Sequence, residues 1–266
     1  FINNYTHTRN DNIIMDNNEV TNSNNILGKG ISGSTLKLIA IITMIIDHFA
    51  AVVIINLIQQ PKYFSSFETL KNLYYISRYI GRISFPIFIF LLIEGFTHTK
   101  DTKKYAFRLF LFALISEIPF NLAIYDSYFY TKHQNIFFTL FLGVAALICF
   151  EKLNTEFKSK KFIKIILYIF ISLFFMVSAK ILNTDYDAIG VLAIILMYLF
   201  RSNKIKAAFA SSLSLVLITA SQFFSFISLI PIKLYNGKRG LNIKYIFYIF
   251  YPLHLLIFYF IKISLN

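Results

Sequence analysis

Long apolar runs, separated by short polar segments, make up most of the chain after residue 33. They cover residues 36–58, 73–96, 105–125, 136–150, 162–182, 188–200, 207–232 and 243–263. An α-helix needs about 20 apolar residues to span the hydrocarbon layer of a membrane, and most of the runs approach that length. The fourth and sixth are shorter and could form tilted or half-length helices. The pattern predicts an all-α membrane protein: a polytopic bundle of about eight transmembrane helices, with seven or nine as alternatives.

The composition supports this fold class. Hydrophobic residues make up 57% of the 266 residues and charged residues only 15%, so the chain has more apolar surface than a soluble domain could bury. Residues 1–33 are rich in Asn and poor in apolar side chains. We expect a disordered, cytoplasmic extension there and a single transmembrane domain over residues 34–266. The single cysteine, Cys149, excludes an internal disulfide and a cysteine-based metal cluster, and we expect no metal.

The chain is strongly basic, with 26 Lys and Arg against 13 Asp and Glu and a net charge of +13. In a soluble protein this excess would indicate nucleic-acid binding. In a membrane protein, Lys and Arg collect in cytoplasmic loops beside anionic lipid headgroups. We therefore expect contact with membrane lipid and no nucleic acid. The basic loops 100–108, 152–164 and 201–206 lie on one side of an eight-helix arrangement, which predicts that both termini are cytoplasmic.

Two basic groups break this charge rule. Arg78 with Arg82, and the segment 233–244, fall on the opposite side of the predicted arrangement. Either one span is miscounted, or some of these residues bind an anion or take part in chemistry. Arg78 and Arg82 are four residues apart and share a helix face, where like charges repel. An anion such as Asp47, Glu117 or a ligand phosphate is expected between them; two arginines that reach the membrane interface are the alternative.

Asp47 and His48 lie in the middle of the first apolar run. A central Asp costs about 2.5–3.5 kcal/mol to insert, so these side chains should face the interior of the bundle and find partners. Adjacent residues of a helix do not face each other, so each needs a contact on another helix. His254, which follows Pro252 in the last run, could lie level with His48. A structural ion pair or buried hydrogen bond is the alternative to a functional role.

Further polar residues lie where the third run ends and the fourth begins. Glu117 precedes Pro119, which removes a backbone donor and is expected to kink the helix. His133 and Asn135 precede the fourth run, where free amides of a helix N-terminus could stabilise a developing negative charge. An ordinary solvated loop with a helix N-cap is an equal alternative. Asp185 lies in a later turn.

The segment 235–240 is a turn whose glycines would let the backbone approach a ligand, and it contains Asn236, Lys238 and Arg239. The eight-helix arrangement places this turn and the preceding polar residues on the non-cytoplasmic half, with Asp47, His48 and His254 near the midplane. That grouping indicates one site. Glu94 and His98, four residues apart, are instead predicted to form an interfacial pair, because two ligands do not make a metal site.

Several short strings resemble, in their order along the chain, those of the TraX family. They are residues 36–40 with Asp47-His48, Gly81-Arg82-Ile83-Ser84-Phe85-Pro86, Ser116-Glu117-Ile118-Pro119-Phe120, His133-Gln134-Asn135, Tyr235-Asn236-Gly237-Lys238-Arg239-Gly240 and Tyr251-Pro252-Leu253-His254. The resemblance covers nearly the whole chain after Ile31. The family is named for a conjugative pilin acetylase and is similar to larger integral-membrane acyltransferases.

The resemblance implies an acetyltransferase of a bacterial cell membrane, which moves an acetyl group from acetyl-CoA to the amine of a peptide or pilin-like acceptor. The catalytic candidates are His48 as proton acceptor, Asp47 or Glu117 as its partner, His133 and Asn135 as stabilisers of the oxyanion, and His254. The candidates for binding acetyl-CoA are Arg78, Arg82, Asn236, Lys238 and Arg239. Direct transfer at His48 is preferred to a scheme in which a histidine carries the acetyl group.

Three alternatives stay open. An ion-coupled transporter would also place Asp, Arg and His near the midplane, although the sequence shows no inverted repeat. A membrane O-acetyltransferase would use the same donor and modify a glycan or lipid. A structural assembly subunit would need the polar residues for folding alone.

Overall fold

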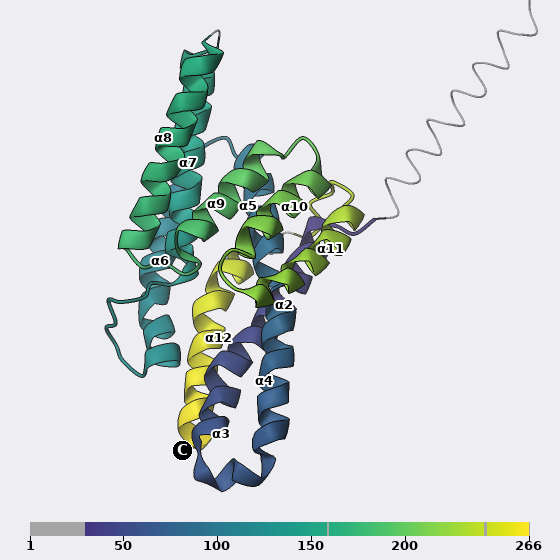
Figure 1. Cartoon of the computed structure of the whole chain (residues 1–266), viewed down its shortest axis with the longest axis vertical. Coiled ribbons are helices and arrows are strands. Elements are labelled where there is room, and N and C mark those ends of the chain that lie inside the picture. Colours follow the sequence, from purple (N-terminus) through teal and green to yellow (C-terminus); the bar gives the residue numbers. More distant parts are fainter. Residues whose placement is uncertain (1–29, 159, 242–243, 266) are drawn as a thin grey trace, which may run out of the picture.

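The computed structural model describes residues 30–158, 160–241 and 244–265. The helices are α2 (Gly33–Phe49), α3 (Ile55–Gln59), α4 (Phe67–Gly81), α5 (Ser84–Thr97), α6 (Thr102–Tyr125), α7 (Ile136–Glu156), α8 (Lys161–Ile181), α9 (Asp187–Leu199), α10 (Lys204–Leu215), α11 (Leu229–Leu234) and α12 (Lys244–Leu265). Among the described residues, six helical stretches are long and apolar enough to cross a membrane. The predicted all-α membrane fold is confirmed (Figure 1). The predicted N-terminal extension lies, up to residue 29, outside the described residues.

The first spanning stretch, Gly33–Gln59, starts at an N-cap and contains one irregular turn. The Ser32 hydroxyl accepts a hydrogen bond from the Thr35 amide and so satisfies a free donor of the first helical turn. Between α2 and α3, the segment Ala50–Ile54 is a π-helix. Such wide turns are often found beside functional sites, and this one begins two residues after His48.

The second spanning stretch, Pro61–Thr97, is a discontinuous helix. A 3-10 segment, Pro61–Ser66, leads into α4, and a turn at residues 82–83 separates α4 from α5. Pro86 lies in the first turn of α5, where the missing amide hydrogen of proline removes no hydrogen bond within the helix. The Ser84 hydroxyl donates to the Gly81 carbonyl at 2.7 Å and holds the two helices together across the break.

The seventh predicted run, residues 207–232, is not a single helix. It forms a hairpin in which α10 runs one way and a 3-10 segment, Ala220–Ser228, returns antiparallel to it with α11. The facing side chains are small, with Ser211, Ser212, Ser225 and Ser228 all buried, so the two backbones pack closely. Lys204 at the start of the hairpin donates to the Tyr235 carbonyl at its end. The chain therefore leaves the hairpin on the side where it entered.

This hairpin changes the predicted arrangement of the chain ends. Gly33 donates its amide to the Lys238 carbonyl, so the start of α2 and the end of the hairpin lie at one end of the bundle, here called the Gly33 end. At the other, Leu265 end, Lys62 donates to the Leu265 carbonyl. Gly33 and Leu265 therefore lie at opposite ends of the bundle, because the hairpin starts and finishes at the Gly33 end. This differs from the eight-helix arrangement, in which the two ends of the membrane domain were expected on one side.

The same correction removes a conflict in the charge pattern. The basic segment around Lys238 and Arg239 lies at the Gly33 end, because Tyr235 beside it bonds Glu94 near the end of α5. The loop at residues 98–101 follows directly. Lys238 and Arg239, which broke the charge rule in an eight-helix arrangement, thus lie beside the other basic loops, whereas Arg78 and Arg82 do not.

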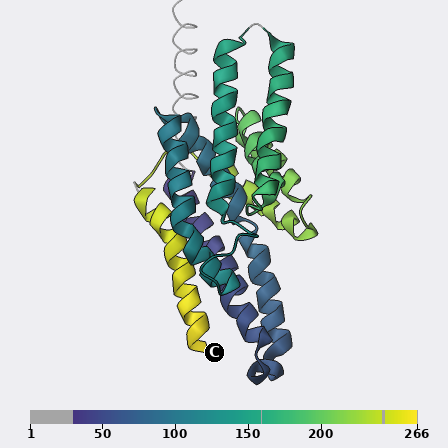
Figure 2. The same ribbon diagram turned by 90° about the vertical axis from the view of Figure 1, so that its left-hand side faces the viewer.

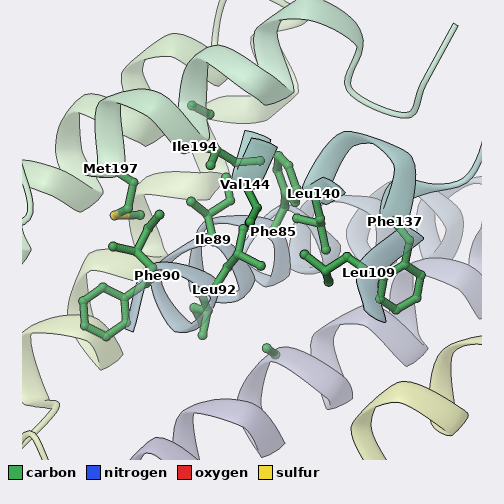
Figure 3. Packing of buried hydrophobic residues seen from close by; sticks show 14 of the residues in the cluster. Phe85, Ile89, Phe90, Leu92, Leu109, Phe137, Leu140, Val144, Ile194 and Met197 are labelled. Atoms are coloured by element: carbon green, nitrogen blue, oxygen red, sulfur yellow. The ribbon is translucent and has the colours of Figure 1, made fainter. Parts of the chain in front are cut away.

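The core is centred on α5, which is apolar on all sides and mostly buried. Figure 3 shows Phe85, Ile89 and Leu92 of this helix packed among side chains of neighbouring helices, including Val144 and Ile194. In contrast, α8 exposes most of its side chains, and its apolar surface is suited to lipid. Figures 1 and 2 show α7 and α8 projecting together beyond the other helices at the Gly33 end.

Candidate functional site

A cavity of about 250 Å³ lies between α2, α4, α5, α6, α7 and α12. Its polar lining gathers residues that are far apart in the sequence: Asp47, His48, Arg78, Arg82, His133 and Asp185. We call it the histidine cavity. Apolar and aromatic side chains complete the walls, so the charges act in a medium of low polarity, where electrostatic interactions are strong.

His48 forms a hydrogen-bonded pair with His254 of α12. The His48 Nδ1 and the His254 Nε2 are 2.6 Å apart, and the two rings are coplanar to within 4° with their centroids 5.0 Å apart. The rings therefore meet edge to edge, as an in-plane N–H···N bond requires. The sequence-based expectation that His254 lies level with His48 agrees with this geometry.

The hydrogen bonds of the pair fix its tautomers. The His254 Nδ1 lies 2.8 Å from the Phe250 carbonyl, which can only accept, so Nδ1 carries the proton. The His254 Nε2 is then an acceptor, and His48 must donate from its own Nδ1. This leaves the lone pair of a neutral His48 on Nε2, which takes part in no hydrogen bond with any described residue. His48 lines the cavity and can accept a proton there.

Asp47 provides the anion that the two arginines require. Its carboxylate accepts a hydrogen bond from the Arg78 guanidinium at 2.8 Å. Gly81 makes this approach possible, because a Cβ at that position would collide with the Asp47 side chain. Arg82 lies on the same side, is hydrogen-bonded to Tyr186, and keeps a buried Nε without a partner among the described residues. That nitrogen is a donor available to a bound molecule.

A strained loop forms another wall of the cavity. Asn183, Tyr186 and Asp187 have φ angles of 50°, 61° and 51°, which is unusual for residues other than glycine. The loop is held against the segment before α7 by two backbone hydrogen bonds of 2.9 Å, from Gln134 to Asn183 and from Asp185 to Gln134. Strain of this kind is often kept at functional sites.

The loop brings Asp185 to His133, with 3.9 Å between the carboxylate Oδ1 and the imidazole Nε2. Burial raises the pKa of Asp185, and the nearby His133 partly opposes this shift. Burial also raises the pKa of Tyr186 to about 12, although Arg82 opposes it. Asp185 is thus a carboxyl group whose charge is costly at this position.

Glu117 and Asn135 lie beside the cavity and bind each other. The Asn135 side-chain amide donates to the Ala113 carbonyl and to Glu117 Oε2, at 2.8 and 2.6 Å, and its oxygen caps α7 by accepting from the Phe137 amide. Both of its donor hydrogens are used. The geometry therefore favours a structural role over the predicted contact with an oxyanion.

The residues predicted to bind acetyl-CoA do not lie together in one site. Arg78 and Arg82 line the histidine cavity, whereas Arg239 lines a second cavity at the Gly33 end. Asn236 donates to the Gly30 carbonyl at 3.0 Å, and the Lys238 carbonyl accepts from Gly33. These two residues anchor the start of α2.

Glu94 and His98 do not form the predicted side-chain pair. The His98 Nδ1 lies 2.8 Å from the backbone carbonyl of Glu94, whose carboxylate accepts instead from the Tyr235 hydroxyl at 3.1 Å. Both residues line the second cavity.

Several cavity residues were missed by sequence reasoning. Tyr186 and Tyr251 were not singled out, and Asp185 was grouped with the other polar residues of the predicted non-cytoplasmic half but was given no role. The available signal was an acidic residue in a short turn between two apolar helices, which says little without knowledge of where the turn folds. In the second cavity, Lys37 and Arg108 were counted only as parts of a family string and a basic loop.

Comparison with known proteins gives two matches. A family model described as TraX protein matches residues 32–262. The probable fimbrial assembly protein FimC, serogroup H1, of Dichelobacter nodosus is 28% identical over 251 residues, which cover 84% of this chain and 93% of the relative. No solved structure matches the chain.

Proposed function

The chain belongs to the TraX family, and from this premise we propose that it is a membrane acetyltransferase that moves an acetyl group from acetyl-CoA to an acceptor amine. The observation that carries the proposal is the hydrogen-bonded pair of His48 and His254. A neutral imidazole with a fixed tautomer and a free lone pair, placed in a cavity inside a membrane, is suited to general-base catalysis.

In the proposed reaction, the nitrogen of the acceptor amine attacks the carbonyl carbon of the thioester, and His48 Nε2 accepts the proton that the amine loses. His254 holds the imidazole in orientation through the Nδ1 bond. The C–N bond forms and the C–S bond breaks, and the proton on His48 passes to the departing thiolate. No acetyl-histidine is needed.

Arg82 is the proposed stabiliser of the negative charge that develops on the thioester oxygen. Its buried Nε has no partner among the described residues, and its guanidinium stays charged. Arg78 has a different task, because its bond to Asp47 neutralises a buried carboxylate. A donor aimed at a developing oxyanion commonly contributes about 10²–10³ in rate.

The proposed acceptor is the amine of a peptide or pilin-like protein. The relative from Dichelobacter nodosus is named as a probable fimbrial assembly protein, which supports an acceptor of this class. We place the Gly33 end in the cytoplasm of a bacterial cell, since the basic loops gather there. The histidine cavity includes Tyr74 and Tyr125, which lie toward the Leu265 end, so an acceptor would approach from that side.

The test is acetyl transfer by the purified protein in nanodiscs, with acetyl-CoA and a peptide that has a free N-terminal amine. Mass spectrometry of the peptide reports the added acetyl group, and His48→Ala should lower the rate about 10²–10⁴-fold. Ile42→Ala, on the exposed face of the same helix, is the matched control and should keep the wild-type rate. Equal rates for His48→Ala and the control would contradict the proposal.

A transporter is the second candidate, and the discontinuous helix formed by α4 and α5 favours it. Broken helices at the level of buried charges are common in substrate sites of carriers. Proteoliposomes distinguish the two functions. Uptake of an amine or peptide without any need for acetyl-CoA would support the carrier, whereas an acetylated product that forms only with acetyl-CoA supports the transferase. Glycan and lipid acceptors in the same assay test O-acetyl transfer.

A further inference from the structure

A second cavity of about 420 Å³ opens at the Gly33 end. Its polar lining comes from α2, α5, α6, α12 and the segment after α11: Lys37, His98, Tyr105, Arg108, Arg239 and Tyr248. We call it the basic chamber. Among the described residues that line it, the one carboxylate is Glu94, which already accepts a hydrogen bond from Tyr235. The chamber therefore carries a net positive charge, which favours an anionic ligand.

Arg108 is the most informative residue of the chamber. Its guanidinium is hydrogen-bonded to Tyr248 and lies 5.8 Å from the centre of the Tyr105 ring. Its Nε is buried and has no partner among the described residues. A buried donor of a charged group is costly when unsatisfied, so this nitrogen indicates an acceptor atom that comes with a ligand. Phosphate oxygens suit a guanidinium because they accept from its planar donors.

The basic chamber and the histidine cavity are neighbours along the axis of the bundle. Phe88, Phe137 and Leu140 line both of them. Figure 3 shows Phe137 and Leu140 next to Leu109, which lines the chamber. The boundary between the two spaces is thus made of apolar side chains, which would admit an uncharged chain more readily than a phosphate.

One face of α2 connects the two spaces. Lys37 lines the chamber, and Ile41, Met44 and His48 line the histidine cavity. Their spacings of four, three and four residues keep them on one side of the helix. Eleven residues separate Lys37 from His48, a rise of about 16 Å at 1.5 Å per residue. A ligand that reaches both must be long, with its charge at one end.

We propose that the basic chamber binds the phosphorylated end of the acyl donor, and that the uncharged arm of the donor passes Phe88, Phe137 and Leu140 to reach His48. The proposal rests on the acetyl-transfer function and assigns the phosphorylated end of the donor a place distinct from Arg78 and Arg82. Donor and acceptor then approach His48 from opposite ends of the bundle. The ligand class is a nucleotide-linked thioester such as acetyl-CoA.

Binding of unacylated CoA tests the chamber without any transfer reaction. The full chain is placed in nanodiscs of zwitterionic lipid, and affinity is measured by titration calorimetry. Arg108→Gln and Arg239→Gln should each weaken binding about 10- to 100-fold, the loss expected for one charge-assisted hydrogen bond. Arg239 lies in an exposed segment, so this variant avoids damage to the helix packing. Lys103→Gln, which removes an exposed charge from the first turn of α6, should bind CoA like the wild type.

His48→Ala separates this proposal from the proposed function, since it should lower the transfer rate about 10²–10⁴-fold and keep CoA affinity. Wild-type CoA affinity in both arginine variants would overturn the chamber assignment, whether or not the protein transfers acetyl groups. Nanodiscs with phosphatidylglycerol test the other source of phosphate. Native mass spectrometry shows whether this lipid stays bound. If the wild type retains the lipid, Arg108→Gln loses it and the wild type binds no CoA, the chamber assignment is also overturned.

Discussion

The histidine cavity and the basic chamber lie between several of the same helices and share Phe88, Phe137 and Leu140, but they differ in how their charges are arranged. In the histidine cavity the carboxyl groups of Asp47 and Asp185 accompany the guanidinium groups of Arg78 and Arg82. In the basic chamber, Lys and Arg side chains surround one carboxylate. Balanced charges hold side chains in position and stabilise charge that develops during a reaction, whereas a net charge attracts a charged ligand.

The backbone differs in the same way. Around the histidine cavity lie the π-helical turn after α2, the break between α4 and α5, and the left-handed residues before α9. The walls of the basic chamber are regular helix and two connecting segments, one after α5 and one after α11. Irregular backbone is costly and is kept where it places functional groups. The comparison thus predicts that variants of the first cavity change the rate and variants of the second change donor affinity.

Arg82→Gln should give the largest effect that separates the two spaces. Loss of the donor for the oxyanion should lower kcat about 10²–10³-fold and leave CoA affinity unchanged. Steady-state kinetics and calorimetry on the same nanodisc preparation measure both quantities. Arg201→Gln, an exposed arginine outside both cavities, is the control. A parallel loss of CoA affinity in Arg82→Gln would merge the two spaces into one donor site.

His254 should have a smaller effect, because it acts through His48. His254→Ala removes one hydrogen bond and should lower kcat about tenfold. His254→Gln keeps an oxygen that can accept from His48 Nδ1 and should recover part of the rate. The pH profile of kcat should shift in the alanine variant and return toward the wild type in the glutamine variant. Identical pH profiles in all three proteins would mean that His254 only fills space.

Gly81→Ala tests the packing beneath the Asp47–Arg78 pair. The added Cβ collides with the Asp47 side chain, and the variant should lose about 1–3 kcal/mol of stability. Gly95→Ala in the basic chamber is the comparison, because its Cβ would first meet the end of the Tyr105 side chain, at 2.9 Å, which can move. Thermal unfolding in detergent measures both. Similar losses would show that the close approach at Gly81 is not special.

Asp185 should give the smallest effect, on the pH dependence of stability. Folding raises the pKa of Asp185. The protonated Asp185 therefore stabilises the protein fully at a pH below the pKa of the unfolded chain, and this stabilisation is lost as the pH rises through the pKa of the folded protein. Asp185→Asn removes this pH dependence and should be the more stable protein at neutral pH. Unfolding temperatures between pH 4 and 8 (about the range in which a raised carboxyl titrates) measure the difference. A wild type that is steeply less stable at acid pH would contradict this.

Most of the fold could be predicted from the sequence, because long apolar runs leave few options in a membrane. The hairpin could not be predicted, because its run is apolar throughout and looks like one long helix. The only sign of two short antiparallel helices is the small residues on the sides that face each other. The site was predicted in part. His48, His254 and Asp47 stand out as polar residues in apolar helices, and the structure brings them together with Arg78.

The remaining site residues depend on tertiary packing. Asp185 reaches the cavity because its loop pairs with the segment before α7, a contact between positions about 50 residues apart that no local pattern indicates. Asn135 carried a correct local signal, that of a helix N-cap, but its functional role was inferred from its position in the chain alone. Arg108 could not be distinguished from other basic residues near a loop.

The hairpin leaves Gly33 and Leu265 at opposite ends of the bundle, and this has a consequence for chemical labelling of intact cells. In a background without Cys149, a cysteine at Ser202 lies beside the basic loops and one at Ser264 lies at the far end of α12. A membrane-impermeant maleimide added to whole cells should therefore modify the second and spare the first. After the membranes are opened, both should react.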